Sequence, residues 1–444
     1  MRAFPSLVAS TLIAALYGAI ESAAQEQKPG LTLTGSNLPT SLSVDDPIPT
    51  DSSELYLSYQ STATVTPTEL VSSNSSDSQS TTESNSVTVL VGSKTAPLTT
   101  SANGTTLSGN TTATETSSGA TPTNTRPCNG YPEFCARSYS NITQVAAHNS
   151  PFVRPGNIAS NQELEVTVQL NDGIRMLQFQ THYVDEIIYL CHSSCDLLNV
   201  GTLENYLTTV TNWLKANPYD VITVLIGNGG FIEPKKFIEP LEKSGLKDFA
   251  YQPPKVPMSL DDWPTLSELI LTGKRAVVFM DYKAEQTAVP YLLDQFSQMW
   301  ETPFSPTDRN FPCTVHRPPG LSDRDARQRL YMANHNLNTQ VSIGGASLLI
   351  PNTVLLNETN AVSGFGSLEK WDRPPSALLV DYYNIGSGNG SVFQVAASLN
   401  NVTYNGKCCG RKTSRAWDSM FSRLFQSLGV AYLVTVASIL FVVV

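Results

Sequence analysis

The stretch from Val145 to Cys195 decides the fold, and it contains the segments VAAHNSPF (145–152), DGIRMLQFQTH (172–182) and IIYLCHSSC (187–195). Each segment is a short apolar run that ends in polar side chains able to do chemistry. Buried strands of parallel sheets are continuous apolar runs, and α/β barrels carry their active sites at the carboxyl ends of their strands. The pattern therefore predicts a parallel α/β barrel, with His148 and His192 at two such strand ends.

Composition predicts one globular domain with appendages and excludes a nucleic-acid-binding role. The chain has 444 residues, of which only 15% are charged, and its net charge is -10. It therefore has no basic footprint of the kind that nucleic acid requires. A negative protein also gives an anionic substrate no long-range attraction, so any positive charge that the chemistry needs must be local.

Residues 1–24 have the features of a secretory signal peptide. Arg2 precedes an apolar run to about Ala19, and the small residues Ser22 to Ala24 suit a cleavage site. A transmembrane anchor is the alternative, but the run is short for one. Residues 25–125 are rich in Ser and Thr and poor in aromatic and charged residues. They predict a disordered, O-glycosylated stalk.

Residues 126–412 have a globular composition. Apolar runs alternate with segments of helical periodicity, which is typical of βα units, and the length suits one barrel domain. Thr202 is a helix cap, and Asn217-Pro218 ends the helix that it begins. We expect strands at 143–148, 174–180, 187–190, 221–227, 275–281, 329–334 and 378–382, and helices at 202–216, 233–243 and 266–271.

Residues 413–444 end in an apolar run from Leu428 to Val444 with no charge after it. Such a terminus resembles a glycosylphosphatidylinositol attachment signal, with Ser414 or Ser419 as the small residue before it. Arg423 and its bulky aromatic neighbours make a poor polar spacer, so a single transmembrane helix is the alternative. Either anchor would hold the domain at the outer face of the cell surface.

The seven cysteines indicate an oxidising compartment, which agrees with secretion. Spacing alone does not fix their connectivity, and metal binding by Cys191, His192 and Cys195 is an alternative for one pair. The expected bridges are Cys128–Cys135, Cys191–Cys195 and Cys313 to Cys408, with Cys409 equally able to replace Cys408. Sequons for N-glycosylation begin at Asn74, Asn103, Asn110, Asn141, Asn357, Asn389 and Asn401.

Two histidines can cleave a phosphodiester together, because one takes the proton of the attacking hydroxyl and the other protonates the leaving oxygen. Imidazole suits both roles, since its pKa lies near neutrality. The segments 148–150 (HNS), 173–177 (GIRML) and 190–192 (LCH) resemble the X domain of phosphatidylinositol-specific phospholipase C. The likeness is greatest to secreted fungal phospholipase-C-like phosphodiesterases and covers about residues 139–404.

This resemblance implies a TIM barrel in which His148 is the general base and His192 the general acid. In the family, the inositol 2-hydroxyl attacks phosphorus, diacylglycerol leaves and a cyclic phosphate forms. Asp381, at the end of a late strand, is placed to orient His148. The resemblance thus implies a phosphodiesterase of lipid metabolism whose substrate is an inositol phospholipid or another phosphodiester.

The chain departs from the family at the position of the catalytic cation. Metal-dependent members have Glu-x-Asp where this chain has Gln178 and Gln180, and a further Glu where it has Gly227, although the Asn ligand is kept as Asn149. Two amides and one Asn would hold Ca²⁺ poorly, so we expect no metal cofactor. Metal-free bacterial members have an Arg at the position of Gln180.

The substitute cations that the sequence offers are His182 and Lys283. Strand alternation places His182 on the face of Gln178 and Gln180, and Lys283 follows the strand that ends at Asp281. We expect Asn149, Gln178, Gln180, His182 and Lys283 to line the substrate pocket. For His182 a structural role is favoured over a role in the pocket, and His316 and His335 are expected to be loop or structural residues.

Two other functions compete with phosphodiester cleavage. The exchange of carboxylates for Gln favours a barrel that binds a sugar or inositol at the cell surface without turnover. A glycoside hydrolase would use Asp281 and Asp381, since that reaction needs a pair of carboxyl groups. Both aspartates have the alternative of being buried acceptors of backbone hydrogen bonds.

Overall fold

The computed structural model describes residues 56–57, 62–64, 126–343, 346–360, 370–406 and 408–409. The predicted signal peptide (1–24), the tail (413–444) and the sequons at Asn74, Asn103 and Asn110 lie outside these residues. Within the part described, no helix combines the length and the apolar character needed to cross a membrane.

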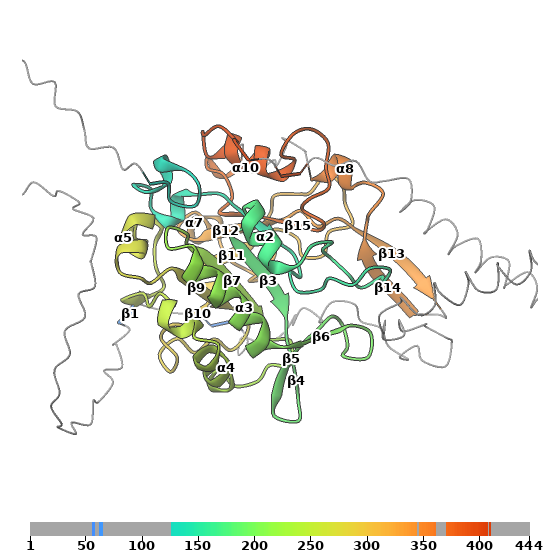
Figure 1. Cartoon of the computed structure of the whole chain (residues 1–444), viewed down its shortest axis with the longest axis horizontal. Coiled ribbons are helices and arrows are strands. Elements are labelled where there is room, and N and C mark those ends of the chain that lie inside the picture. Colours follow the sequence, from blue (N-terminus) through green and yellow to red (C-terminus); the bar gives the residue numbers. More distant parts are fainter. Residues whose placement is uncertain are drawn as a thin grey trace, which may run out of the picture.

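The central element is a sheet of eight strands in the order β10-β9-β7-β3-β2-β15-β12-β11, and every neighbouring pair is parallel. The two outermost strands, β10 and β11, are separated in the chain by only the four residues of α6, so the sheet must curl until its ends meet. This is the predicted α/β TIM barrel (Figure 1). Its strands are β2 (Gln144–Ala147), β3 (Met176–Gln180), β7 (Ile222–Gly227), β9 (Ala276–Met280), β10 (Leu293–Asp294), β11 (Met299–Glu301), β12 (Leu330–Asn334) and β15 (Ala377–Val380).

Helices and short helical turns surround the barrel. The longest, α3, begins at the predicted cap, where the Thr202 hydroxyl accepts from the Asn205 amide, and α5 has the bounds expected for it. The predicted helix 233–243 is split into η3 and α4. The helices are α2 (Val166–Asp172), α3 (Leu203–Ala216), α4 (Ile238–Lys243), α5 (Leu266–Leu271), α6 (Gln295–Gln298), α7 (Asp323–Ala326), α8 (Leu356–Thr359) and α10 (Val392–Leu399), with 3-10 turns η1 (Pro132–Phe134), η2 (Tyr139–Asn141), η3 (Pro234–Phe237), η4 (Leu246–Phe249) and η5 (Leu260–Asp262).

Strand alternation divides the apolar side chains into two cores. On β3, Leu177 and Phe179 face outward and pack with α3, where the ring of Tyr206 meets Phe179 edge-on at 5.0 Å. Met176 faces the barrel interior, and Gln178 and Gln180 line an interior cavity. The barrel interior is therefore apolar at depth and polar towards the carboxyl ends of the strands.

The predicted strand 187–190 exists as β5 (Ile187–Cys191), but it does not belong to the barrel. It forms a separate antiparallel sheet with β4 (His182–Val184) and β6 (Asn199–Thr202), which extends from the lower edge of the molecule in Figure 1. Asp185 and Glu186, at the turn between β4 and β5, both have positive φ, as a two-residue hairpin requires. His182 therefore belongs to this sheet, and the expectation that it shares a barrel face with Gln178 and Gln180 is wrong.

The barrel has a seam between β10 and β11, where the described residues form no ladder. Side chains bridge it instead. The guanidinium of Arg317 donates to Glu301 Oε2 on β11 at 2.7 and 3.0 Å and to the hydroxyl of Tyr282, just beyond β9, at 3.1 Å. Gln295 of α6 donates to the other oxygen of Glu301. A fully buried ion pair thus links the two sides of the seam.

Two short pieces of the predicted stalk, 56–57 and 62–64, are among the described residues, and both pack on the barrel. The ring of Tyr56 contacts Tyr282 and Phe296, and β1 (Ala63–Thr64) pairs antiparallel with β8 (Lys255–Val256). Two tyrosines, Tyr56 and Tyr59, in a Ser/Thr-rich segment give too little periodicity to reveal this docking. A further two-stranded sheet, β13 (Asn338–Ile343) with β14 (Ala346–Pro351), lies beyond β12.

The cysteine predictions are confirmed for two bridges and wrong for the third. Cys128 pairs with Cys135, and Cys191 pairs with Cys195. Cys408 is bonded to its neighbour Cys409, so the expected bridge to Cys313 is not formed. The reason is position: Cys313 packs against a cluster around Trp371, whereas Cys408 and Cys409 pack against the main core.

The sequons that the structure describes differ in exposure. Asn141, Asn389 and Asn401 are exposed, whereas Asn357 is half-buried at the start of α8. Exposure is what a glycan needs, and occupancy remains a prediction for all of them.

Arg317→Met tests the side-chain bridge across the seam. The variant leaves the carboxylate of Glu301 buried without its cation, which we expect to lower the free energy of unfolding by about 3–5 kcal/mol. Denaturant titration of the secreted chain measures this change. The control is Lys243→Met, which removes a solvent-exposed pair with Glu239 and should leave the midpoint unchanged. Equal midpoints for both variants would contradict a role for the buried pair.

Candidate active site

The first histidine of the site is positioned by two neighbouring barrel strands. β2 pairs with β15 so that Ala147 lies opposite Val380, and the residues that follow, His148 and Asp381, emerge side by side at the carboxyl edge. Asp381 Oδ1 lies 2.8 Å from His148 Nδ1. A carboxylate at Nδ1 fixes the tautomer that carries its proton there, so Nε2 keeps the lone pair that a general base uses.

The loop between β2 and α2 holds this dyad through residues that the sequence analysis did not select. Asn161 Nδ2 donates to Asp381 Oδ1 at 2.8 Å. Gln162 Nε2 donates to the backbone oxygens of His148 and Val380 at 2.7 and 3.0 Å. The signal that could have found them is a run of polar residues, Ser160 to Gln162, in a loop that follows a catalytic strand end.

The same loop also holds the second histidine. The Nδ1 atom of His192 donates to the backbone oxygen of Ala159 at 2.5 Å, and the imidazole stacks on Phe152 at 5.0 Å with an interplanar angle of 7°. The neighbouring disulfide Cys191–Cys195 closes the turn on which His192 lies. The second imidazole thus reaches the barrel mouth from the antiparallel sheet, with Nε2 within 3.3 Å of Asn149 Nδ2.

Asn149 lies between the two imidazoles. Its Nδ2 atom is 3.2 Å from Nε2 of His148 and 3.3 Å from Nε2 of His192. The backbone at Asn149 is left-handed, with φ of 47°, a conformation that Asn tolerates better than most residues. Its amide N–H donates to Gln178 Oε1 at 2.9 Å. Asn149 is 1% exposed, His148 5% and His192 6%, so all three residues are buried.

The residues at the family's cation position do not fit Ca²⁺. Gln178 and Gln180 are amides, and Gly227 offers no side chain; a Cβ there would lie 2.0 Å from Gln180 Oε1. Among the described residues, Gln180 Oε1 and Asn149 Oδ1 are buried oxygens without a hydrogen-bond partner. Two neutral oxygens fall far short of the six to eight ligands, several of them carboxylates, that Ca²⁺ takes.

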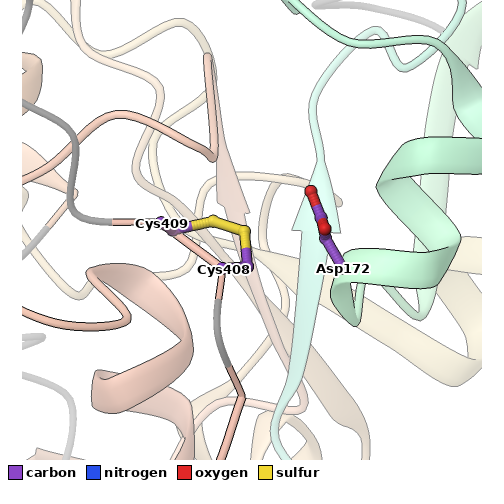
Figure 2. Close-up of side chains that lie close together, drawn as sticks. All are labelled: Asp172, Cys408 and Cys409. Atoms are coloured by element: carbon purple, nitrogen blue, oxygen red, sulfur yellow. A yellow bond between two sulfur atoms is a disulfide. The ribbon is translucent and has the colours of Figure 1, made fainter.

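A different group of possible metal ligands lies away from this site. Asp172, Cys408 and Cys409 place their ligand atoms within 4.8 Å of one another (Figure 2). The two sulfur atoms are bonded to each other, so neither is a thiolate, which is the form that binds metals. Asp172 Oδ2 accepts a hydrogen bond from the Tyr383 hydroxyl at 2.7 Å. With its sulfurs oxidised, this cluster is not a metal site.

The two predicted substitute cations have contacts elsewhere. Lys283 Nζ lies 3.9 Å from Glu233 Oε1, and both side chains are more than a third exposed. His182 is half-buried on β4, opposite Tyr189. The geometry therefore joins His148, His192, Asp381, Asn149 and Gln178 by direct contacts, and adds Gln180 through the shared cavity, but it brings neither His182 nor Lys283 into that network.

The other titratable residues considered in the sequence have structural surroundings. Asp281 Oδ1 accepts from the backbone N–H groups of Asn228 and Tyr282, both at 2.7 Å. Burial lowers the pKa of His335 to about 3, and its ring stacks on Phe311. Burial, with nearby Arg317, also lowers the pKa of His316, whose Nδ1 accepts from the Phe304 N–H. Both histidines are therefore neutral at physiological pH.

The chain is similar to known proteins over the region that contains the site. The family model described as PI-PLC X 1 matches residues 134–400. A protein of Arthroderma benhamiae named an uncharacterized secreted protein is 62% identical over 444 residues, 98% of each chain. PI-PLC X domain-containing protein 1 of the same organism is 42% identical over 286 residues, which cover 62% of this chain and 90% of that protein. The structure of phosphatidylinositol-specific phospholipase C from Listeria monocytogenes aligns at a TM-score of 0.41 with 14% identity and covers 61% of this chain and 96% of that one.

Gly227→Ala tests whether Gln180 fills the space that a side chain at position 227 would need. The new methyl group would force Gln180 to move, and overpacking of this kind costs about 1–3 kcal/mol of folding free energy. In a Gln180→Ala background the space is empty, so the same substitution should cost less. Denaturant titrations of the two single variants and the double variant give a coupling energy, which we expect at about 0.5–3 kcal/mol. Additive effects would show that the two positions do not share this space.

Proposed function

The chain belongs to the PI-PLC X domain family, and we propose that it is a secreted phosphodiesterase that cleaves its substrate by acid–base catalysis with His148 and His192, without a bound metal ion. The observation that carries the proposal is the meeting of the two Nε2 atoms on one amide, that of Asn149. An inositol phospholipid is the substrate that the family favours. The similarity to a protein named as secreted supports the extracellular location.

The reaction needs one proton acceptor and one proton donor around the phosphorus atom. His148 accepts the proton of the attacking hydroxyl at Nε2, and Asp381 stabilises the imidazolium that forms. His192, protonated at both ring nitrogens once substrate displaces Asn149 from Nε2, donates its Nε2 proton to the leaving oxygen. The proton on its Nδ1 stays in the hydrogen bond to Ala159, which keeps the ring aligned for the transfer.

The phosphoryl oxygens would meet neutral donors rather than a cation. Substrate entering between the imidazoles would take over the Nδ2 protons of Asn149, which now face the two Nε2 atoms. Loss of one preorganised donor to developing charge costs about 10²–10³ in rate in other enzymes. We therefore propose slow turnover, unless His182 or Lys283 reaches the phosphoryl group when substrate is bound.

One feature favours a binding protein as the second candidate. Both imidazole Nε2 atoms are occupied by Asn149 and are nearly buried, an arrangement that suits a closed recognition site as well as a resting enzyme. A glycoside hydrolase is less suited to the contacts, because Asp281 Oδ1 accepts two backbone N–H groups and Asp381 Oδ1 accepts from Asn161 and His148.

Substitution of the proposed acid and base tests the function in the secreted chain. His148→Ala and His192→Ala should each lower kcat on phosphatidylinositol by about 10²–10⁴, because general acid–base catalysis contributes that much. Asp381→Asn should lower kcat while leaving the melting temperature close to that of the parent. His316→Ala, which changes a histidine in a loop, is the control and should keep full activity. Headgroup binding with no turnover by the parent chain would favour the binding protein instead.

Removal of metal ions tests the proposed absence of a catalytic cation. Turnover should be the same in EDTA and in added Ca²⁺, because Gln178, Gln180 and Gly227 provide no anionic ligand. The matched variant restores the carboxylates as Gln178→Glu, Gln180→Asp and Gly227→Glu, and calorimetry should show that it has gained Ca²⁺ binding. Loss of the parent's activity in EDTA, with recovery in Ca²⁺, would overturn the metal-free mechanism.

A further inference from the structure

Two short pieces of the N-terminal segment dock on the barrel, and we define them together as the strap: Tyr56–Leu57 and Thr62–Thr64. The ring of Tyr56 packs on Phe296 at 4.9 Å and edge-on against Tyr282 at 5.6 Å. Its hydroxyl is buried, and burial raises the pKa of Tyr56. A chain remote in sequence thus contributes an aromatic side chain to the folded domain.

The second piece adds a strand to the edge of the barrel domain. Ala63 pairs with Val256 and Thr64 with Lys255 in an antiparallel ladder. The loop that carries β8 is itself tied to α6, because the Met258 N–H donates to Gln298 Oε1 at 2.8 Å. Since Phe296 also belongs to α6, both contacts of the strap converge on the helix that occupies the seam between β10 and β11.

The Tyr56 piece of the strap lies at the edge of the barrel mouth, whereas the ladder of β1 with β8 follows a segment that pairs at the start of β9, towards the other end of the strands. Tyr282 follows Asp281 immediately after β9, and in a parallel sheet all strand ends of this kind lie at one edge, the edge that carries His148. The Tyr282 hydroxyl accepts from Arg317, whose ion pair with Glu301 bridges the seam. Tyr56 therefore packs on a residue shared by the seam and the mouth.

We propose that the seam between β10 and β11, with α6, is a docking surface for the chain's own strap. A cut between Thr64 and Arg126 then releases the strap and opens the mouth beside Tyr282. The docked contacts are few: one aromatic side chain and a two-residue ladder. Docking within one chain needs little affinity, because the effective concentration of the strap is high. After a cut in the 61 residues between Thr64 and Arg126, docking becomes bimolecular.

The consequence for turnover rests on the proposed phosphodiesterase function, whereas release of the strap does not. Release of the strap uncovers Tyr282 and Phe296 beside the mouth, which gives an apolar entrance suited to the hydrocarbon part of a lipid substrate. Release should therefore raise turnover on phosphatidylinositol in vesicles more than on a water-soluble inositol phosphodiester. The N-terminal segment would then keep the secreted protein in a low-activity form until proteolysis.

The test uses the full secreted chain with a site for a specific protease placed between residues 65 and 125. After cleavage, the N-terminal fragment should separate from the barrel on gel filtration at micromolar concentration, because the linkage that raised its effective affinity about 10²–10⁴-fold is gone. Hydrogen exchange of the amides in β8 and α6 should rise on cleavage. Near-ultraviolet circular dichroism checks that the barrel stays folded.

Variants in the uncut chain separate docking from folding. Tyr56→Ala should raise exchange in β8 and α6 as cleavage does, whereas Tyr56→Phe keeps the ring and should retain protection. Thr62→Ala changes an exposed strap residue and is the matched control.

Three outcomes would count against the proposals. Co-elution of the cut fragment with unchanged exchange would overturn the releasable strap. Release without a change in turnover of an active chain would overturn its control of the mouth. Release from a chain that shows no turnover, cut or uncut, would establish the strap and count against the phosphodiesterase.

Discussion

The hydrogen bond between Asp381 and His148 is the contact on which the rest of the site depends. It exists because the ladder between β2 and β15 sets Ala147 opposite Val380, so that the next residue on each strand emerges at the same height. A shift of one strand by one residue in this register would turn its side chain to the other face of the sheet and separate it from the other. The chemistry of the mouth is therefore fixed by backbone pairing in the barrel wall before any loop contributes.

The loop after β2 turns this dyad into a site for two histidines. Three residues of this loop hold the site. Phe152 stacks on the ring of His192, and the backbone oxygen of Ala159 accepts a hydrogen bond from His192 Nδ1. Asn161 donates a hydrogen bond to Asp381. The second histidine comes from outside the barrel, so its position depends on this loop and on the Cys191–Cys195 bridge rather than on a barrel ladder. The loop after β2 therefore positions both the acid, His192, and the base, His148.

The sequence predicts those features of the fold and site that depend on neighbouring residues in the chain. The apolar runs before His148 and Asp381 identify barrel strands, Thr202 identifies the start of α3, and close cysteines identify two disulfides. The prediction from sequence was wrong or incomplete where contacts between distant segments determine the structure. The strands β10 and β11 have only two and three residues, the hairpin of β4 and β5 has the apolar character of a barrel strand, and Tyr56 is one of two tyrosines in a polar segment. The polar run from Ser160 to Gln162 marks the loop of Asn161, but its partner Asp381 is known only from the fold, which returns this loop over the mouth.

The neutral residues at the cation position form one packing unit rather than a set of separate substitutions. Gln180 Oε1 occupies the space that a side chain at position 227 would enter, and Gln178 Oε1 accepts the amide of Asn149, whose left-handed backbone directs its side chain between the imidazoles. A carboxylate at position 227 cannot enter while Gln180 keeps its place. A carboxylate at 178 would add a buried charge beside Asn149, which is costly without a cation to pair with it. The steric fit of Gln180 on Gly227 and the neutral contact of Gln178 with Asn149 therefore support each other, and a return to metal ligands requires several positions to change together.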